Sequence, residues 1–357
     1  MAPDRGSETT AEAATVEAAL GSLSLQESQS ALAQVVDSSD PVASTPPHLS
    51  HDPATNAKRT DPFQFGQRHL SESDDVFEYN AWDHVLPDSA HYDFCESQYA
   101  AQRAAPVSDF DRDRFNEHPE KWWDLFYKQK TSTFFKDRKW LVQEFPVLQE
   151  ITKKDAGSKV VLEVGAGAGN TAFPILRMNE NPELRIFAVD FSKKAVETMR
   201  SAEDYTNGNG VMSAEVWDAA GDSLPPGVEE GSVDIVIMIF IFSALNPKQW
   251  QQAVTNINRI LKPKGEVLFR DYGRGDLAQV RFKAGRWMED NFYVRGDGTR
   301  VYFFEKEQLE EIWGGSFDVL NLDVDRRLIV NRQRRIKMYR CWIQGRFQKK
   351  APGTLPE

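Results

Sequence analysis

The chain has 357 residues, of which 40% are apolar and 27% are charged, and its net charge is −11. This composition can bury one large core or two modest ones, and the longest apolar run, 233–245, is too short to span a bilayer. The two cysteines, Cys95 and Cys341, lie far apart, which excludes a disulfide framework and a Cys-x-x-Cys metal site.

All six histidines precede residue 119, so the rest of the chain has no imidazole group. Histidine-dependent catalytic triads and zinc sites built from His and Cys are therefore excluded from that region. We expect a soluble, metal-free protein in which any reaction catalysed beyond residue 118 needs no histidine base.

The acidic residues are concentrated in the N-terminal part. Residues 1–110 hold 5 Lys and Arg against 18 Asp and Glu, and the remainder holds 38 against 36. The segment 326–350 has ten basic residues and no acidic residue. Such a segment is typical of a surface that binds a polyanion, although it can also be a solvated basic face.

Residues 1–60 are rich in Ala, Ser, Thr and Pro and contain almost no aromatic residues, so we expect them to be disordered. The acids Glu8, Glu12 and Glu17 argue against a mitochondrial presequence, and a secretory apolar core is absent. The cytoplasm is therefore the expected location.

Residues 61–150 are expected to form an N-terminal extension that contributes to ligand binding. Between 61 and 93, aromatic residues alternate with acids, and they either wrap the main domain or recognise a substrate or partner. From Pro119 onwards, the spacing of aromatic residues predicts one or two helices up to about residue 150. Trp122 and Trp123 point about 100° apart on such a helix, so one of them is free to cover a ligand.

The stretch from 160 to 190 predicts a strand, a glycine loop, a helix and a second strand. A short β-branched run leads into Gly165, Gly167 and Gly169, which let the backbone approach a ligand closely. The Gly-x-Gly-x-Gly spacing differs from the dinucleotide fingerprint and favours S-adenosylmethionine, which has no phosphate. Asp190 ends the second strand and is placed to accept from the ribose hydroxyls of this cofactor. An ordinary tight turn is the alternative interpretation.

Strands and helices continue to alternate after Asp190, which predicts a doubly wound, seven-stranded α/β sheet of the Rossmann-like class I methyltransferase type over residues 151–350. The strands are expected near 160–164, 184–190, 214–218, 233–242, 266–272, 317–325 and 336–347. Helices are expected over 193–200, 248–261, 276–287 and 306–313. The last two strands should form an antiparallel edge, and a ligand should lie at the carboxyl ends of the central strands.

Four segments are long enough to be specific for a protein family. They are Phe-Tyr-Lys at 126–128 with Phe-Phe-Lys-Asp-Arg-Lys-Trp-Leu at 134–141, Ile-Phe-Ile-Phe-Ser-Ala at 239–244, Leu-Phe-Arg-Asp-Tyr-Gly at 268–273, and Asn-Phe-Tyr-Val-Arg-Gly-Asp-Gly-Thr-Arg at 291–300. In them the chain resembles the tRNA N3-methylcytidine methyltransferases, over roughly residues 61–349. Segments at 65–68, 80–83, 325–327 and 330–332 resemble the branch that methylates cytosine 32 in the anticodon loop of threonine tRNAs.

The resemblance implies S-adenosylmethionine as the cofactor and assigns residues to its site. Asp190 would hold the ribose, Asp218 and Ala219 would flank the adenine, and Ile239 would form an apolar floor. The full set implied by the resemblance is Trp123, Tyr127, Gly165, Asp190, Asp218, Ala219 and Ile239. We add Gly167 and Gly169 on backbone grounds.

The chemistry of cytosine agrees with this substrate, because N3 of the neutral base has a lone pair and can attack a methyl group without prior deprotonation. Methylation at carbon 5 would need a cysteine nucleophile, and Cys341 is expected in a terminal strand. Asp271, beside Arg270, is our candidate for stabilising the cation that develops on the base. Alternatively, Asp271 only orders Arg270 in a salt bridge.

The resemblance implies a tRNA partner, and it implies that the extension, residues 61–150, contributes to cofactor and tRNA binding. Basic and aromatic residues are candidates for contacts with the phosphates and bases of the tRNA. These candidates are Lys136, Arg138, Tyr272, Arg281, Lys283, Phe292, Tyr293, Arg295, Arg300, Arg332, Arg334 and Arg335. The need for a helper protein, such as an aminoacyl-tRNA synthetase, stays open, and no membrane partner is expected. Two other functions stay open as well: methylation of a small molecule or protein, and binding of cofactor or RNA without turnover.

Overall fold

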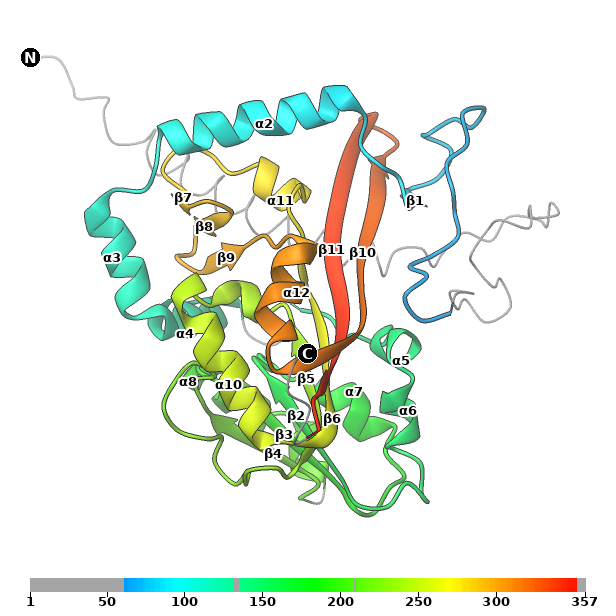
Figure 1. The fold of residues 1–357 in the computed structure, drawn as a ribbon, viewed down its shortest axis with the longest axis vertical. Coiled ribbons are helices and arrows are strands. Elements are labelled where there is room, and N and C mark those ends of the chain that lie inside the picture. Colours follow the sequence, from blue (N-terminus) through cyan, green and yellow to red (C-terminus); the bar gives the residue numbers. More distant parts are fainter. Residues whose placement is uncertain (1–60, 131–134, 209, 352–357) are drawn as a thin grey trace, which may run out of the picture.

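The computed structural model describes residues 61–130, 135–208 and 210–351. The tail that we expect to be disordered, residues 1–60, lies outside the described residues. Within the described ranges, no helix is long and apolar enough to cross a membrane. Figure 1 shows a large twisted sheet with helices on both faces, and a small three-stranded sheet near helix α2 (Ser89–Ala104).

The large sheet has eight strands in the order β1-β10-β11-β6-β5-β2-β3-β4. Its five parallel strands are β6 (Leu261–Tyr272), β5 (Val233–Ile239), β2 (Lys159–Val164), β3 (Leu184–Asp190) and β4 (Met212–Val216). The sheet continues with antiparallel β11 (Ile336–Lys349), β10 (Phe317–Asn331) and β1 (Ala81–Asp83). The predicted doubly wound fold is confirmed, with all seven predicted strands. The sequence did not predict β1, which lies in the extension and makes β10 an inner strand.

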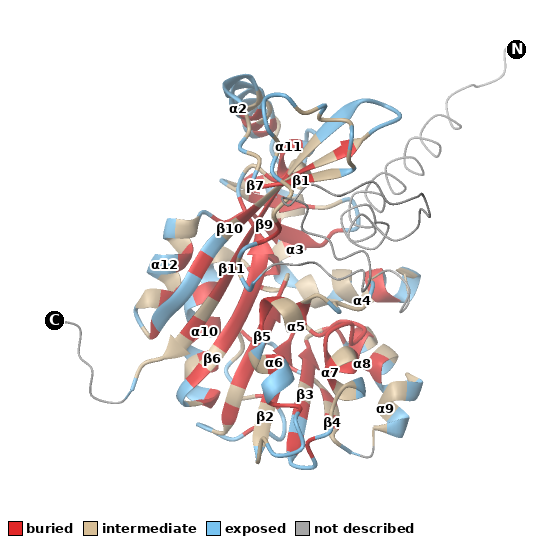
Figure 2. Cartoon of the chain, turned by 90° about the vertical axis from the view of Figure 1, so that its right-hand side faces the viewer, coloured by how far each residue is buried: buried red, intermediate tan, exposed pale blue. Residues whose placement is uncertain are grey.

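Two hydrophobic clusters cover the two faces of the parallel strands, because alternate side chains of a strand point to opposite sides. One face packs against α10 (Trp250–Ile260) and α12 (Lys306–Gly314). The other packs against α5 (Leu141–Glu144), α6 (Val147–Glu150), α7 (Ala172–Arg177) and α8 (Lys193–Arg200), and the short α9 (Glu203–Asn207) follows α8. Figure 2 shows the buried residues running along the strands between these helices, so both layers of helices hold the strands in place.

The local sequence explains where these helices begin and which side they bury. Ser192 caps α8, because its hydroxyl accepts a hydrogen bond from the Ala195 N–H at 3.1 Å. In α10, the buried residues Val254, Ile257 and Ile260 recur every three or four positions, so one apolar stripe faces the sheet. Pro263 follows closely and prevents the helix from continuing.

The remaining elements gather near the carboxyl ends of the parallel strands. They are α2, α3 (Asp109–Glu117), α4 (Pro119–Lys130), the 3₁₀ turns η2 (Phe242–Ala244) and η3 (Pro247–Gln249), α11 (Leu277–Val280), and the small sheet of β7 (Trp287–Glu289), β8 (Phe292–Val294) and β9 (Arg300–Tyr302). The prediction of a helix over 276–287 is wrong. Only α11 forms, because Gly285 adopts a left-handed φ of 74° and Trp287 starts β7.

Candidate functional site

A cavity lies at the carboxyl ends of β2, β3, β5 and β6, with α4 on one side. This is the position expected for a ligand of a doubly wound sheet. Its lining includes eight of the nine residues that the sequence assigns to the cofactor: Trp123, Tyr127, Gly165, Gly167, Asp190, Asp218, Ala219 and Ile239. Gly169 does not line the cavity. Its N–H donates to the Ala166 carbonyl at 2.9 Å, so Gly169 shapes the turn.

The glycine loop is packed tightly against α4. Gly167 has a left-handed φ of 59°, and a Cβ atom at this position would lie 2.4 Å from the hydroxyl oxygen of Tyr127. A larger residue would therefore be strained and would also displace the tyrosine. The close approach of Tyr127 means that the loop and α4 form one side of the cavity together.

A buried carboxylate supports the loop from behind. Glu163, at the end of β2, accepts from the Ala172 N–H at the start of α7 at 2.9 Å and lies 3.5 Å from the Arg138 guanidinium. Burial raises the pKa of Glu163 to about 7, although Arg138 acts in the opposite direction. Arg138 also lines the cavity, so the structure places this candidate tRNA contact beside the glycine loop.

Asp190 links the ends of β2 and β3. These strand ends form the half of the cavity that we assign to the cofactor, which we call the cofactor half. One carboxylate oxygen accepts from the Gly167 N–H and the other from the Ser192 N–H, both at 2.9 Å. Each oxygen of an ionised carboxylate has a further lone pair, so Asp190 can also accept from hydroxyl groups of a ligand in the cavity. Burial raises the pKa of Asp190 to about 6, and the two backbone hydrogen bonds oppose this shift.

Helix α4 is held in place through Asp124. Its carboxylate accepts from the Ser192 hydroxyl at 2.6 Å and from the Lys194 N–H at 3.0 Å, which anchors α4 to the start of α8. The two tryptophans of α4 diverge as the helical spacing predicts: Trp123 lines the cavity, and Trp122 packs against the hydrophobic core.

These residues fit S-adenosylmethionine. Its ribose hydroxyls need acceptors such as Asp190, and its adenine needs an apolar surface such as Ile239. Its sulfonium cation is attracted to the faces of aromatic rings, which Trp123 and Tyr127 provide with their centroids 6.1 Å apart. Within the described residues, no group of three or more His, Cys, Asp or Glu side chains is arranged to hold a metal ion.

The other end of the cavity is lined by residues of β6, η2 and the β8–β9 turn. Tyr272 and Arg295 are there, with the guanidinium 5.8 Å from the ring centroid. Sequence reasoning missed four further residues that line this end, Phe240, Ser243, Asp297 and Thr299. The signal was available, because all four lie inside the family-specific segments 239–244 and 291–300.

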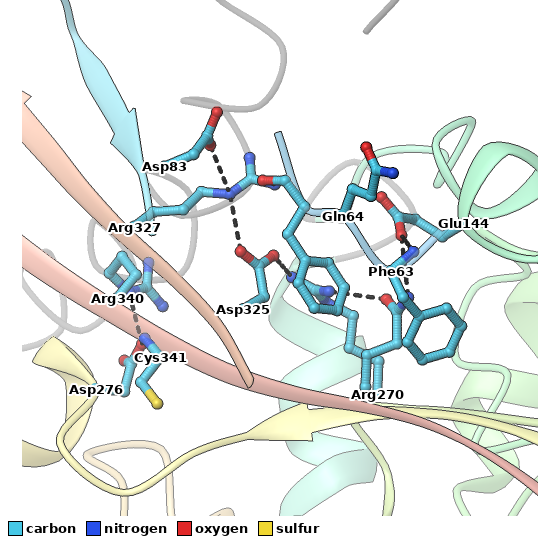
Figure 3. Close-up of polar contacts among 12 residues, drawn as sticks. Phe63, Gln64, Asp83, Glu144, Arg270, Asp276, Asp325, Arg327, Arg340 and Cys341 are labelled. Atoms are coloured by element: carbon cyan, nitrogen blue, oxygen red, sulfur yellow. Dashed lines mark hydrogen bonds and ion pairs between the residues drawn. The ribbon is translucent and has the colours of Figure 1, made fainter. Parts of the chain in front are cut away.

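The structure does not support direct substrate contacts for Asp271 and Arg270. Asp271 is fully buried and does not line the cavity, and it accepts from the backbone N–H groups of Ser243 and Tyr272, both at 2.9 Å. Arg270 points to the other side of β6 and forms an ion pair with Asp325 at 2.5 Å, as Figure 3 shows. The alternative that Asp271 orders Arg270 in a salt bridge is wrong, because Arg270 pairs with Asp325 instead.

Comparison with known proteins gives a consistent result. Residues 161–265 match the family described as methyltransferase domain. The chain is 50% identical over 285 residues to the tRNA N(3)-methylcytidine methyltransferase of Schizosaccharomyces pombe, and the alignment covers 80% of this chain and 92% of that protein. The chain belongs to the tRNA N3-methylcytidine methyltransferase family.

Two other members of this family are similar over most of the chain. The Drosophila melanogaster tRNA N(3)-methylcytidine methyltransferase is 43% identical over 295 residues, which cover 82% of this chain and 90% of that protein. The tRNA(Thr) (cytosine(32)-N(3))-methyltransferase of Saccharomyces cerevisiae is 52% identical over 289 residues, which cover 80% of this chain but 46% of that protein. This chain therefore spans less than half the length of the S. cerevisiae relative.

Three of the candidate tRNA contacts are buried in the core, which corrects our prediction. Phe292 and Tyr293 are almost inaccessible, and the hydroxyl of Tyr293 donates to a glutamine of α2 at 2.9 Å. Arg300 is 3% exposed and donates to Asn116 Oδ1 at 2.8 Å and to the Ala244 carbonyl at 3.2 Å. These side chains stabilise the β8–β9 hairpin and are not accessible to RNA.

The other candidate contacts are accessible to different degrees. Arg281 and Lys283 are exposed between α11 and β7, and Lys136 is exposed before α5. Arg332, Arg334 and Arg335 are exposed in the turn that joins β10 to β11, at the end of the long hairpin in Figure 1. Five of the ten basic residues in the segment 326–350 instead form ion pairs or hydrogen bonds within the protein. They are Arg327, Arg340, Arg346, Lys349 and Lys350.

We expect the affinity of the protein for S-adenosylmethionine to fall as the pH is lowered through about 6, the raised pKa of Asp190. Protonation removes one of the acceptor positions that the ribose hydroxyls use. Titration calorimetry from about pH 5 to about pH 8 measures the effect. The Asp190→Asn variant should bind more weakly by about 1.5–3 kcal/mol and lose the pH dependence near 6. An unchanged pH profile in this variant would show that another group controls binding.

Proposed function

We propose that this chain transfers the methyl group of S-adenosylmethionine to N3 of cytosine 32 in the anticodon loop of threonine tRNAs, in the cytoplasm. The observation that carries the proposal is the cavity that combines the glycine loop, Asp190 and Asp218 with Tyr272 and Arg295 at its other end. The choice of base and tRNA is supported by the 52% identical S. cerevisiae relative, which is named for cytosine 32 of tRNA(Thr).

Each residue of the cofactor half has a role in this proposal. Asp190 accepts from the ribose hydroxyls, Asp218 and Ala219 flank the adenine, and Ile239 packs under it. Trp123 and Tyr127 lie against the sulfonium, and Gly165 and Gly167 leave room for the ligand. When bound, S-adenosylmethionine supplies an electrophilic methyl group.

The nucleophile needs no activation by the protein, because N3 of cytosine already has a free lone pair. Among the described residues, the cavity lining contains no histidine and no cysteine, so it offers neither an imidazole base nor a thiol that could attack carbon 6. Burial raises the pKa of Cys341 to about 12, which keeps this thiol protonated. The main task of the site is to hold the base in line with the methyl group.

Methylation of a panel of purified tRNAs tests the proposal. We expect N3-methylcytidine at position 32 of threonine tRNAs, detected by mass spectrometry of nucleosides and mapped by primer extension. Each reaction is run with and without the matching aminoacyl-tRNA synthetase, because a helper protein is part of the open question. Transfer of methyl groups to protein or small molecules, with no product in any tRNA, would favour the alternative methyltransferase functions.

The exposed arginines of the β10–β11 turn lead to a prediction about tRNA affinity. We expect the triple alanine variant at Arg332, Arg334 and Arg335 to bind tRNA more weakly and to flatten the plot of log K against log[salt] by about two units, because each lost phosphate contact removes about 0.7–0.9 units. Affinity for S-adenosylmethionine should be unchanged. Fluorescence anisotropy over a range of salt concentrations measures the slope.

The matched control is a triple alanine variant at Lys153, Lys154 and Lys264, which are exposed near the starts of β2 and β6. It removes the same charge at the end of the sheet away from the cavity. If both triple variants changed the slope equally, the effect would come from net charge, and the β10–β11 turn would be only a solvated basic surface.

A further inference from the structure

Three carboxylates line the cavity among the described residues, and one of them has no role in the cofactor half. Asp190 and Asp218 are assigned to the cofactor, whereas Asp297 lies in the β8–β9 turn at the other end of the cavity, which we call the substrate end. Asp271, the carboxylate that the sequence favoured for stabilising the methylated base, is buried away from the cavity. Asp297 is therefore the carboxylate that remains available to a bound base.

The carboxylate of Asp297 is fixed by one of its two oxygens. Oδ1 accepts from the Thr299 N–H at 2.9 Å and from the Thr299 hydroxyl at 2.6 Å. In the part of the chain that the structure describes, no group donates a hydrogen bond to Oδ2, and Arg295 bonds instead to the Thr299 hydroxyl and the Arg300 carbonyl, both at 3.4 Å. Asp297 is exposed and lines the cavity, so Oδ2 offers its lone pairs to a ligand there.

The turn that carries Asp297 is held against α4. The Arg295 N–H donates to the Thr299 carbonyl at 2.7 Å, which closes the turn. Gly298 has a left-handed φ of 83°, and a Cβ atom there would lie 2.2 Å from Cε3 of the Trp122 ring. Thr299 is 2% exposed. These contacts fix the position of the carboxylate before a substrate binds.

We propose that Oδ2 of Asp297 accepts a hydrogen bond from the exocyclic amine of the target cytosine, while Thr299 holds Oδ1. This inference rests on the proposed function. Cytosine has an amine at carbon 4, whereas uracil has a carbonyl oxygen there, which would face the lone pairs of the carboxylate. Asp297 thus selects cytosine over uracil, because it attracts the one base and repels the other.

The same contact stabilises the transition state. As the N3 lone pair forms a bond to the methyl carbon, the bond from that carbon to sulfur breaks and its electron pair stays on sulfur, so the positive charge passes to the base. This charge is shared with the exocyclic amine, which becomes a stronger donor during the reaction. A carboxylate fixed beside the amine stabilises the developing charge without any rearrangement of the protein.

The variant Asp297→Asn separates this role from the turn, because the amide oxygen can still accept both bonds from Thr299 while the NH₂ group replaces Oδ2 with a donor. Binding is measured with S-adenosylhomocysteine, which has no methyl group to transfer. The substrates are a threonine tRNA with cytidine at position 32 and the same tRNA with pyrimidin-2-one ribonucleoside there, which keeps N3 but lacks the amine. For the wild type, we expect removal of the amine to weaken binding about tenfold, since a hydrogen bond to a charged acceptor is lost. Asp297→Asn should bind the cytidine tRNA no more tightly than the other tRNA.

Turnover and a control variant keep the test specific. In single-turnover assays, Asp297→Asn should methylate bound cytidine tRNA at least about tenfold more slowly than the wild type, with unchanged melting temperature and cofactor affinity. Asp290→Asn removes the same charge from the exposed β7–β8 turn, outside the cavity lining, and should behave as the wild type does.

Equal binding of the two tRNAs to the wild type would overturn the inference, and this comparison does not depend on the folding of any variant. The same preference for the amine in the wild type and in Asp297→Asn would overturn it as well. A wild type that does not methylate the cytidine tRNA would instead refute the proposed function.

Discussion

Replacing Asp325 with alanine is expected to lower the free energy of unfolding by about 3–5 kcal/mol, because it leaves two buried guanidinium groups without their shared partner. Asp325 is 0% exposed. One of its oxygens lies 2.5 Å from Arg270 Nη2, and the other lies 3.2 Å from Arg327 Nε. Neither arginine can reach bulk water easily, so their desolvation cost would no longer be offset.

The surroundings of Asp325 show why the loss is not repaired locally. Arg270 has Trp140 and Trp342 at 5.1 Å from its guanidinium carbon, which stabilises a cation but provides no hydrogen-bond acceptor. Its remaining bond is to Gln344 at 2.8 Å, and Arg327 retains the Phe65 carbonyl at 3.3 Å and the more distant carboxylate of Asp83 at 3.6 Å. Figure 3 shows Asp325 between the two arginines, at the centre of this network.

Urea denaturation of the variant measures the loss, and Asp323→Ala is the matched control. Asp323 lies on the same strand, but its side chain is 51% exposed and its ion pair with Lys306 has a distance of 3.8 Å. We expect the control to change stability by about 0–1 kcal/mol, as for other exposed ion pairs. Similar losses in both variants would mean that the burial of the Asp325 network contributes nothing beyond an ordinary surface pair.

The cofactor half of the cavity was predictable because its signals are local in the sequence. The glycine loop and Asp190 end two consecutive strands, so residues 23 positions apart meet directly in the bond from Gly167 to Asp190. The order of strands and helices then determines the sheet and places the ligand at its carboxyl edge. The divergence of Trp122 and Trp123 follows from helical geometry alone.

The substrate side was harder to predict because burial there depends on distant partners. Tyr293 bonds to a residue 191 positions away, and Arg300 to one 184 positions away. The basic segment 326–350 contains no acid, yet Arg340 is buried against Asp276 at 2.8 Å. The composition of a segment cannot show which of its arginines meets an acid across the sheet.

The same argument applies to the extension, whose aromatic residues left two interpretations open. Trp82 is 1% exposed and packs against Leu328 and Val330 of β10, while its indole N–H donates to the Val76 carbonyl at 2.8 Å. The segment around β1 therefore wraps the catalytic sheet, as the simpler interpretation expects. It also supplies Asp83 and Phe65 to the network around Arg327 and Arg270.

We therefore expect removal of residues 1–60 to leave methyltransferase activity intact, and removal of residues 1–87 to abolish it. The longer deletion removes Trp82, and loss of a buried tryptophan alone costs about 3–5 kcal/mol. It also removes the strand paired with β10 and leaves Arg327 without Asp83. Together these losses approach the whole stability of a typical domain, about 5–15 kcal/mol.

Activity assays and thermal melting of the two truncated proteins, beside the full chain, measure the difference. The variant Trp82→Ala in the full chain separates packing from length, because it removes the side chain and keeps β1. We expect it to lower the melting temperature while cofactor affinity at low temperature is retained, since Trp82 does not line the cavity. Full activity and an unchanged melting temperature in the protein that starts at residue 88 would show that β10 and β11 fold without the extension. The buried charges of Arg270 and Asp325 would then be satisfied by the catalytic sheet alone.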